Sequence, residues 1–392
     1  MVESGTKWCR KMKTVCGLNR CNGCMACLEK CRQDAITVED NLEYYNAIIN
    51  TEKCVNCGLC TKVCPNVTGN VTNKPKWWYQ GWAKPELRDC ASSGGAASAI
   101  IRAFIEQGGY VASCLFRDGK FEFQVTNKMD VARKFAGSKY VKSSPAGIYG
   151  KIQSLLDDDK KVLFIGLPCQ VAAVKQFMKN DSNLVTADLI CHGTPSPRLL
   201  EKCLKEYGYD IKNLTDISFR IKSLYEINKD GKPIAALHTM DNYLIAFLHS
   251  YDYTENCYSC KFATLDRVSD ITLGDSWGTE LKGEIKNGIS LILCQSQKGQ
   301  RLVESAGLKL LDVDVENAIL HNEQLNRPSK NSKLRKKFFD NFRKYNNFGR
   351  ALVKTAPMIV IKEKSKSVIK FIIRGGGGTQ GFMVKGKGEE RI

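Results

Sequence analysis

Apolar and polar positions alternate in blocks through the middle of the chain and predict strands and helices in turn. Lys161–Ile165 and Leu184–Ile190 are short, nearly continuous apolar runs, the pattern of strands buried on both faces of a sheet. A turn follows each run, and then a segment with apolar residues at helical spacing, Val171–Met178 and Arg198–Tyr207. This order of strand, turn and helix predicts βαβ units and a mainly parallel sheet.

Similar patterns on either side extend this α/β region. Gly108 and Gly109 end a predicted helix, and a four-residue turn joins two predicted hairpin strands. We expect helices at Ala96–Gln107, Ile148–Leu156 and Asp241–His249, and strands at Tyr110–Phe116, Phe121–Thr126, Thr215–Lys222 and Ile289–Cys294.

Near the N-terminus, cysteines replace the apolar pattern. Two runs of four cysteines share one spacing, and Pro65 follows the second run. Two-cluster ferredoxins have this spacing, and in them the fourth cysteine of each run binds the other run's cluster. Zinc sites and disulfide frameworks are the alternatives, but zinc sites rarely place four ligands in ten residues, and no apolar signal segment supports secretion. We therefore expect one [4Fe–4S] cluster on Cys21, Cys24, Cys27 and Cys64 and another on Cys31, Cys54, Cys57 and Cys60.

Length and composition predict several domains in a reducing cytoplasm. The chain has 392 residues, 43% of them hydrophobic, and 18 cysteines. We expect a ferredoxin-type domain at 1–66, a linker at 67–88, an α/β domain at 89–320 and a basic helical tail at 321–392. The aromatic residues Trp77, Trp78, Tyr79 and Trp82 in the linker would seal a domain boundary or flank a cofactor.

The positive charge is concentrated at the C-terminal end. Residues 329–392 hold 17 lysines and arginines against 4 acidic residues, whereas the whole chain has a net charge of +18. A solvated helical extension is the simplest interpretation; peripheral contact with an anionic membrane or an acidic partner is the alternative. Basic residues without a recognition motif do not indicate nucleic acid.

The turn that opens the helix after residue 95 can bind an anion. Ser92-Ser93-Gly94-Gly95 offers hydroxyls, free backbone N–H groups and the positive end of a helix dipole. Taken alone, this stretch favours an ordinary N-cap of small residues. Cys169 and Cys191 follow two predicted strands, where ligands bind in parallel sheets.

Five motifs in this order resemble the family of coenzyme F420 hydrogenase/dehydrogenase beta subunits. They are Ser92–Gly95, Gly166–Gln170, Cys191-His192-Gly193, Cys257-x-x-Cys260 and Asp270–Gly278. The resemblance implies an α/β flavin-binding domain behind an α+β ferredoxin-like module, with FAD as cofactor. It implies FAD contacts at Ser92, Ser93, Gly94, Gly95, Lys139, Tyr140 and His192, and a third [4Fe–4S] cluster on Cys169, Cys191, Cys257 and Cys260.

Other roles for these residues remain open. Cys169 at a helix N-terminus with His192 as base would suit cysteine catalysis, and the four later cysteines would otherwise be buried thiols or one zinc or disulfide pair. His192 and Lys139 would then be structural or solvated. Arg267, Asp270 and Asp275 would be ionic struts or flavin contacts.

The resemblance implies an oxidoreductase that passes electrons between [4Fe–4S] clusters and FAD, with hydride exchange to a small organic or deazaflavin-type substrate. Its partner would be ferredoxin or a redox subunit. Two alternatives are a flavin-free electron-transfer subunit of a larger complex, and a cluster- or zinc-binding scaffold whose basic tail binds a membrane or nucleic acid.

Overall fold

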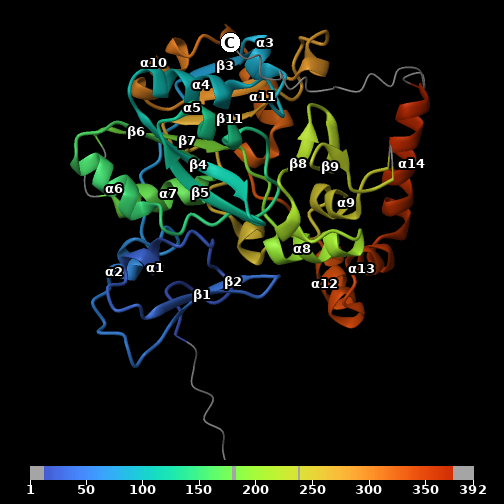
Figure 1. Ribbon diagram of the computed structural model, residues 1–392, viewed down its shortest axis with the longest axis horizontal. Helices are drawn as coiled ribbons and strands as arrows, with labels where there is room; N and C mark the ends of the chain where they lie inside the picture. Colours follow the sequence, from blue (N-terminus) through green and yellow to red (C-terminus); the bar gives the residue numbers. More distant parts are fainter. Residues whose placement is uncertain (1–12, 179–181, 237–238, 374–392) are drawn as a thin grey trace, which may run out of the picture.

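A small cysteine-rich domain lies against one side of a larger α/β domain in the computed structural model (Figure 1). The structure describes residues 13–178, 182–236 and 239–373, so the glycine-rich end of the predicted tail lies outside the described residues. No helix among the described residues is long and apolar enough to cross a membrane.

The cysteine-rich domain contains little regular structure. Its antiparallel strands β1 (Ile36–Asp40) and β2 (Tyr45–Ile49) carry the loops that hold the cysteines. Two short helices, α1 (Ala26–Lys30) and α2 (Leu59–Lys62), each begin after a residue with positive φ. Cysteines make up much of the buried interior of this domain, as expected for a fold organised around clusters.

The main sheet has eight strands in the order β13-β3-β12-β11-β7-β6-β4-β5. Its four central strands are parallel, as the βαβ pattern predicted, and both flanks are antiparallel, so the sheet is mixed. The strands are β3 (Trp77–Trp82), β4 (Tyr110–Arg117), β5 (Lys120–Thr126), β6 (Val162–Gly166), β7 (Leu184–Leu189), β11 (Ile271–Asp275), β12 (Ser290–Cys294) and β13 (Lys309–Leu311).

The aromatic segment predicted as part of a linker belongs to this sheet. Strand β3 pairs with β12 on one side and β13 on the other, both antiparallel. It reads poorly as a strand because Trp77, Trp78 and Tyr79 are all half-buried and show no alternation of apolar and polar residues. Its partners follow it by some 200 residues in the chain, so no local pattern could reveal the pairing.

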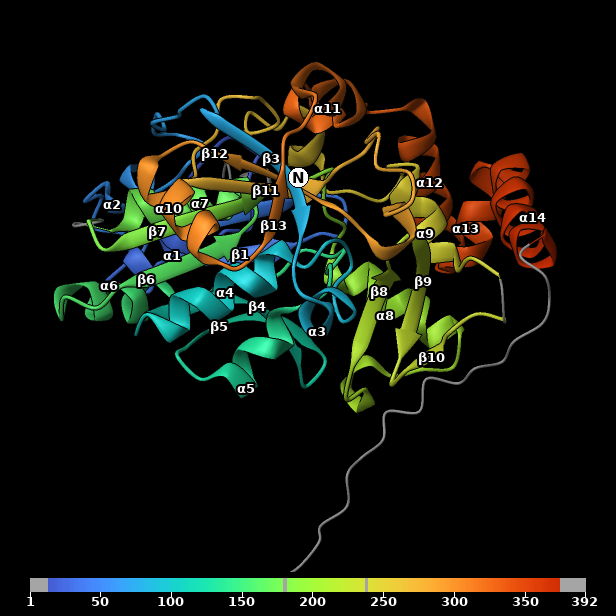
Figure 2. The same cartoon turned by 90° about the horizontal axis from the view of Figure 1, so that it is seen from above.

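Helices cover both faces of the sheet (Figures 1 and 2). On one face α4 (Ala96–Glu106) and α10 (Gln297–Ser305) share an apolar core with the strands. On the other face α6 (Tyr149–Asp157) and α7 (Pro168–Phe177) share a core with the cysteine-rich domain. The shorter elements are α3 (Pro85–Arg88), α5 (Met129–Ala132), α11 (Val315–His321), η1 (Arg133–Phe135), η2 (Ile211–Asn213), η3 (Glu255–Ser259), η4 (Ile285–Asn287) and η5 (Glu323–Leu325).

A second subassembly packs beside the main sheet. Three short strands, β8 (Ile217–Ile221), β9 (Leu224–Lys229) and β10 (Lys232–Pro233), form a separate antiparallel sheet. They lie against the helices α8 (Pro197–Glu206), α9 (Asn242–Leu248), α12 (Lys333–Tyr345), α13 (Phe348–Thr355) and α14 (Pro357–Ile373), which Figure 2 shows together at one end of the molecule.

The basic tail is helical as predicted, but it is more than a solvated extension. Phe338, Phe339, Phe342 and Phe348 from α12 and α13 are buried in one core with α8 and α9. The many lysines and arginines make this core hard to recognise in the sequence, because the apolar residues occupy only one face of each helix.

Candidate functional site

The first cysteine group surrounds a small cavity in the N-terminal domain. Cys21, Cys24, Cys27 and Cys64 all line it, so the fourth cysteine of the second run lies with the first three of the first run. Burial raises the pKa of Cys24 and of Cys27. Buried thiols of this kind remain protonated until a metal replaces their protons, which suits a cluster site.

A fifth thiol, Cys16, lines the same cavity. It hydrogen-bonds to Cys21 and Cys64, and this contact lowers the pKa of both, to about 6 for Cys64. From the sequence we expect Cys16 to be an ordinary free thiol without an evident partner, because it stands outside the repeated run. Its closeness to Cys64 depends on the fold of the whole domain.

The second cysteine group is more open. Burial raises the pKa of Cys60, and nearby Cys54 and Cys31 act in the same direction. Cys57 is exposed. Throughout the described residues, no three potential ligands converge as they would around a single metal ion. The influence of Cys54 and Cys31 on Cys60 indicates that these three thiols lie near one another, as a cluster with its iron atoms at separate corners requires.

The third cysteine group forms where three separate segments meet. Cys169 is in the first turn of α7, Cys191 follows β7, and Cys257 and Cys260 lie in and after η3. Burial raises the pKa of Cys191, and Cys257, Cys169 and Cys260 reinforce the shift, which places all four thiols near one another. Burial likewise raises the pKa of Cys169 to about 12.

Arg267 ties the loop that carries Cys257 and Cys260 to the sheet. Its guanidinium is buried, donates to Asp188 of β7 at 2.8 Å and donates to the carbonyl of Phe262 at 3.1 Å. Asp270 accepts from Thr186 at 2.8 Å and so is also a strut. A buried ion pair with several hydrogen bonds fixes local geometry, which here is the position of the loop.

A large cavity of about 420 Å³ opens at the carboxyl ends of the central strands. Six of the seven residues implied as FAD contacts line it: Ser92, Ser93, Gly95, Lys139, Tyr140 and His192. Gly94 does not line the cavity. A Cβ on Gly94 would lie 2.5 Å from the carbonyl oxygen of Gly81 and 2.6 Å from the backbone nitrogen of Ser290, so this glycine lets the turn approach the sheet.

Hydrogen bonds brace the turn and the loop opposite it. The Ser93 hydroxyl donates to the carbonyl of Ile289 at 2.9 Å, and the Ser92 hydroxyl accepts from the backbone N–H of Ser138 at 2.9 Å. The ammonium of Lys139 donates to the carbonyls of Phe135 and Ala136, at 2.8 and 2.7 Å. Burial lowers the pKa of Lys139. The Lys139 ammonium therefore binds backbone carbonyls of its own loop.

Arg220 and Phe247, which the motifs did not indicate, line the same cavity beside Asp275 and Tyr140. Arg220 of β8 makes a two-pronged ion pair with Asp275 of β11, at 2.6 and 3.0 Å. Asp275 thus lines the cavity and is not a strut of the cysteine loop. The ring of Tyr140 stacks on Phe247 with centroids 4.5 Å apart. No sequence signal marks Arg220, because β8 belongs to the separate small sheet.

The third cysteine group borders this cavity. Cys191, His192 and Thr194 all line it, and the Thr194 hydroxyl lies 3.9 Å from the sulfur of Cys257. His192 lines the cavity. Burial by the surrounding protein disfavours the charged imidazole and so lowers the pKa of His192. It is therefore neutral at pH 7 and presents one donor and one acceptor nitrogen.

Residues beside the first and third cysteine groups are in contact. The Asn256 amide, beside Cys257, donates to the side-chain oxygen of Asn22, beside Cys21, at 3.1 Å. The Tyr149 hydroxyl donates to the carbonyl of Cys24. Polar contacts thus run from the first cysteine group to the third, which lies on the wall of the large cavity.

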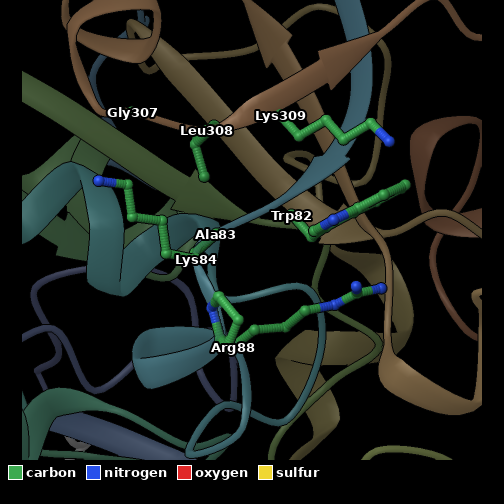
Figure 3. A pocket seen from close by; sticks show the side chains of 8 residues that line it. Trp82, Ala83, Lys84, Arg88, Gly307, Leu308 and Lys309 are labelled. Carbon is green, nitrogen blue, oxygen red and sulfur yellow. The ribbon is translucent and has the colours of Figure 1, made fainter.

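A smaller pocket of about 350 Å³ lies beside α3 (Figure 3). Arg88 and Lys309 lie over the ring of Trp82, with centroid distances of 4.5 and 4.8 Å. Arg88 also pairs with Glu284 at 2.8 Å. Figure 1 places α3 and β3 at the end of the molecule opposite the cysteine-rich domain, so this pocket is remote from that domain.

Two family models match separate parts of the chain. Residues 20–67 match the 4Fe-4S dicluster domain, and residues 159–314 match the family described as the C terminus of the coenzyme F420 hydrogenase/dehydrogenase beta subunit. A chain of the F420-reducing [NiFe] hydrogenase complex from Methanosarcina barkeri is similar at a TM-score of 0.44 with 16% identity, over 70% of this chain and 95% of that chain.

Two curated relatives are similar over about half of this chain. An uncharacterized protein of Methanocaldococcus jannaschii is 25% identical over 202 residues, 43% of this chain and 55% of the relative. A subunit of the F(420)H(2) dehydrogenase of Methanosarcina mazei is 23% identical over 235 residues, 54% of this chain and 65% of the relative. The similarity therefore spans less than two thirds of either relative. The resemblance seen in the motifs is confirmed: one part of the chain matches the 4Fe-4S dicluster domain, and a later part matches the C-terminal model of coenzyme F420 hydrogenase/dehydrogenase beta subunits.

Proposed function

We propose that this chain is an iron–sulfur flavoprotein in which three [4Fe–4S] clusters and one FAD connect a redox partner with a small organic or deazaflavin-type substrate. The observation that carries the proposal is the place of the third cysteine group: a residue beside it bonds to one beside the first group, and its Cys191 lines the large cavity. Clusters would supply one-electron transfer, and FAD would convert it to hydride exchange.

The cysteines would hold the clusters in the groups that the fold brings together. The first group would use Cys21, Cys24, Cys27 and Cys64, the second would use Cys31, Cys54, Cys57 and Cys60, and the third would use Cys169, Cys191, Cys257 and Cys260. Cys16 would donate a hydrogen bond to sulfurs of the first group, a contact that tunes a cluster from outside its ligand set.

The cavity offers the contacts that a flavin nucleotide needs. The N-terminus of α4, opened by the turn that includes Ser92 and Gly95, would bind the pyrophosphate through backbone N–H groups. Aromatic rings such as Tyr140 would border the apolar part of the ligand. Lys139 would act indirectly, since its ammonium holds the neighbouring loop. His192, neutral at pH 7, would hydrogen-bond the ligand.

The redox partner of this chain would determine both the direction of electron flow and the substrate. One relative belongs to an F(420)H(2) dehydrogenase, so a deazaflavin substrate and a partner subunit are the first candidates. The same relative also supports a second function, a flavin-free electron-transfer subunit. In that case the cavity would receive part of a neighbouring subunit instead of a cofactor.

Cofactor content of protein purified without oxygen tests the proposal. We expect about twelve irons and twelve sulfides per chain, with one FAD. About eight irons and no flavin would instead identify an electron carrier with two clusters.

A matched pair of variants then tests the third site. Cys191→Ser should lose about four irons and keep the two clusters of the N-terminal domain. Cys203→Ala is the control, because Cys203 is buried in α8 and belongs to none of the three groups. Equal iron in Cys191→Ser and wild type would contradict the third cluster.

A further inference from the structure

Lys142 is a buried lysine between the first and third cysteine groups. Its side chain is 6% exposed. Its ammonium donates to the carbonyl oxygen of Asn22, next to Cys21, at 3.2 Å. It also interacts electrostatically with Cys21 of the first group and with Cys169 of the third group.

The surroundings of Lys142 hold its side chain in this place. The backbone N–H of Lys142 donates to the carbonyl of Pro195 at 2.9 Å, and its ammonium lies 5.3 Å from the centre of the Tyr45 ring. A Cβ on Gly23 would lie 3.1 Å from Cδ of Lys142, so the absence of a side chain there leaves room for the lysine stem. The conformation is therefore built in by its neighbours.

Within the described part of the chain, no carboxylate pairs with this ammonium. Asp40 bonds to the hydroxyl of Tyr45, the ring near Lys142, and its carboxylate accepts from the hydroxyls of Tyr45 and Ser196, at 2.8 and 2.6 Å. A buried charge without a counter-charge is unfavourable. The nearby groups that can supply negative charge are the thiolates of the two cysteine groups.

We propose that Lys142 is the shared counter-charge of the first and third clusters and raises the reduction potential of both. This inference rests on the proposed function, which places clusters in these groups. An oxidised [4Fe–4S] cluster with four thiolates carries a charge of about −2 and gains a further negative charge on reduction. A fixed positive charge between two such clusters favours the reduced state of each. One side chain would thus raise the reduction potentials of both clusters together.

The test is an EPR-monitored redox titration of the full chain, purified without oxygen. Lys142→Met removes the charge and keeps the length of the side chain. We expect the reduction equilibrium of both clusters to become about tenfold less favourable, a fall of about 59 mV for one electron. Lys142→Arg keeps the charge and should leave both potentials near their wild-type values. The Cys191→Ser variant assigns the signal of the third cluster.

Lys261→Met is the matched control. Lys261 interacts electrostatically with Cys64 of the first group, but it is exposed, so solvent screens its charge. Because Lys261 also follows Cys260 of the third group, we expect shifts at both clusters, each much smaller than in Lys142→Met. Shifts in Lys261→Met as large as those in Lys142→Met would overturn the special role of Lys142.

The outcomes separate this inference from the proposed function. Wild-type protein with only about eight irons would refute the third cluster itself. Wild-type protein with about twelve irons, in which Lys142→Met moves neither potential or only one, would overturn the shared role alone. If Lys142→Met fails to assemble both clusters while Lys142→Arg assembles them, the requirement for the charge is supported. If Lys142→Arg fails in the same way, the charge is not what matters and the inference is overturned.

Discussion

The first and third cysteine groups are neighbours in space, but they are held together in different ways. The first group lies within residues 21–64 of one small domain, where two short loops bend around a common cavity. The third group gathers cysteines from the start of α7, the end of β7 and the segment around η3. Its geometry depends on the order of strands in the main sheet and on the Arg267 strut. A local site can therefore tolerate changes that would dismantle a site assembled by the sheet.

Replacing Arg267 should break the third site and spare the first. Arg267→Met leaves the Asp188 carboxylate buried without its partner, a loss of about 3–5 kcal/mol of stability for a pair of this kind. We expect chemical denaturation to show that loss, and iron analysis to show about four irons fewer per chain. Lys298→Met is the control, because Lys298 is a half-exposed lysine 3.7 Å from another strut, Asp270. Loss of all clusters from Arg267→Met would remove the distinction between the two groups.

Replacing Gly94 tests whether the wall of the large cavity, like the third cysteine group, depends on contacts with the main sheet. In Gly94→Ala the new methyl group meets backbone atoms of Gly81 and Ser290, so the turn before α4 must move away. Overpacking of this kind lowers stability by about 1–3 kcal/mol. We expect flavin per chain to fall while iron stays near its wild-type level. Gly69→Ala is the matched control, because a Cβ there meets no atom within 4 Å; a similar loss of flavin in both variants would contradict the prediction.

The smallest expected effect concerns Asp241, which caps α9 near the same cavity. Burial raises its pKa to about 6, above its ordinary value of 3.8, so the folded protein binds a proton more tightly than the unfolded chain. The stability that this protonation contributes is complete below about pH 3.8 and is lost as the pH rises through 6. Between pH 5 and 7 the unfolding free energy of wild type should fall by about 1 kcal/mol relative to Asp241→Asn. Urea denaturation at the two pH values measures this difference, and a constant difference would contradict the raised pKa.

Much of the fold could be predicted from the chain because its signals are local. The apolar runs predicted β6 and β7, and the glycines at 108 and 109 predicted the end of α4. Strand β3 was missed because its partners β12 and β13 come about 200 residues later. The buried phenylalanines of α12 were obscured by the basic residues around them, although their helical spacing was present in the sequence.

The sequence by itself determined the spacing of the first eight cysteines and the turn before α4, because a loop of fixed length reaches only a limited region of space. Only the tertiary structure decided which cysteines border the cavity, that Asp275 pairs with Arg220, and that Lys142 lies between two groups of thiols. These relations depend on the order of strands in the sheet and on the docking of one domain against another. Residues far apart in the chain meet there, and no local pattern records that they do.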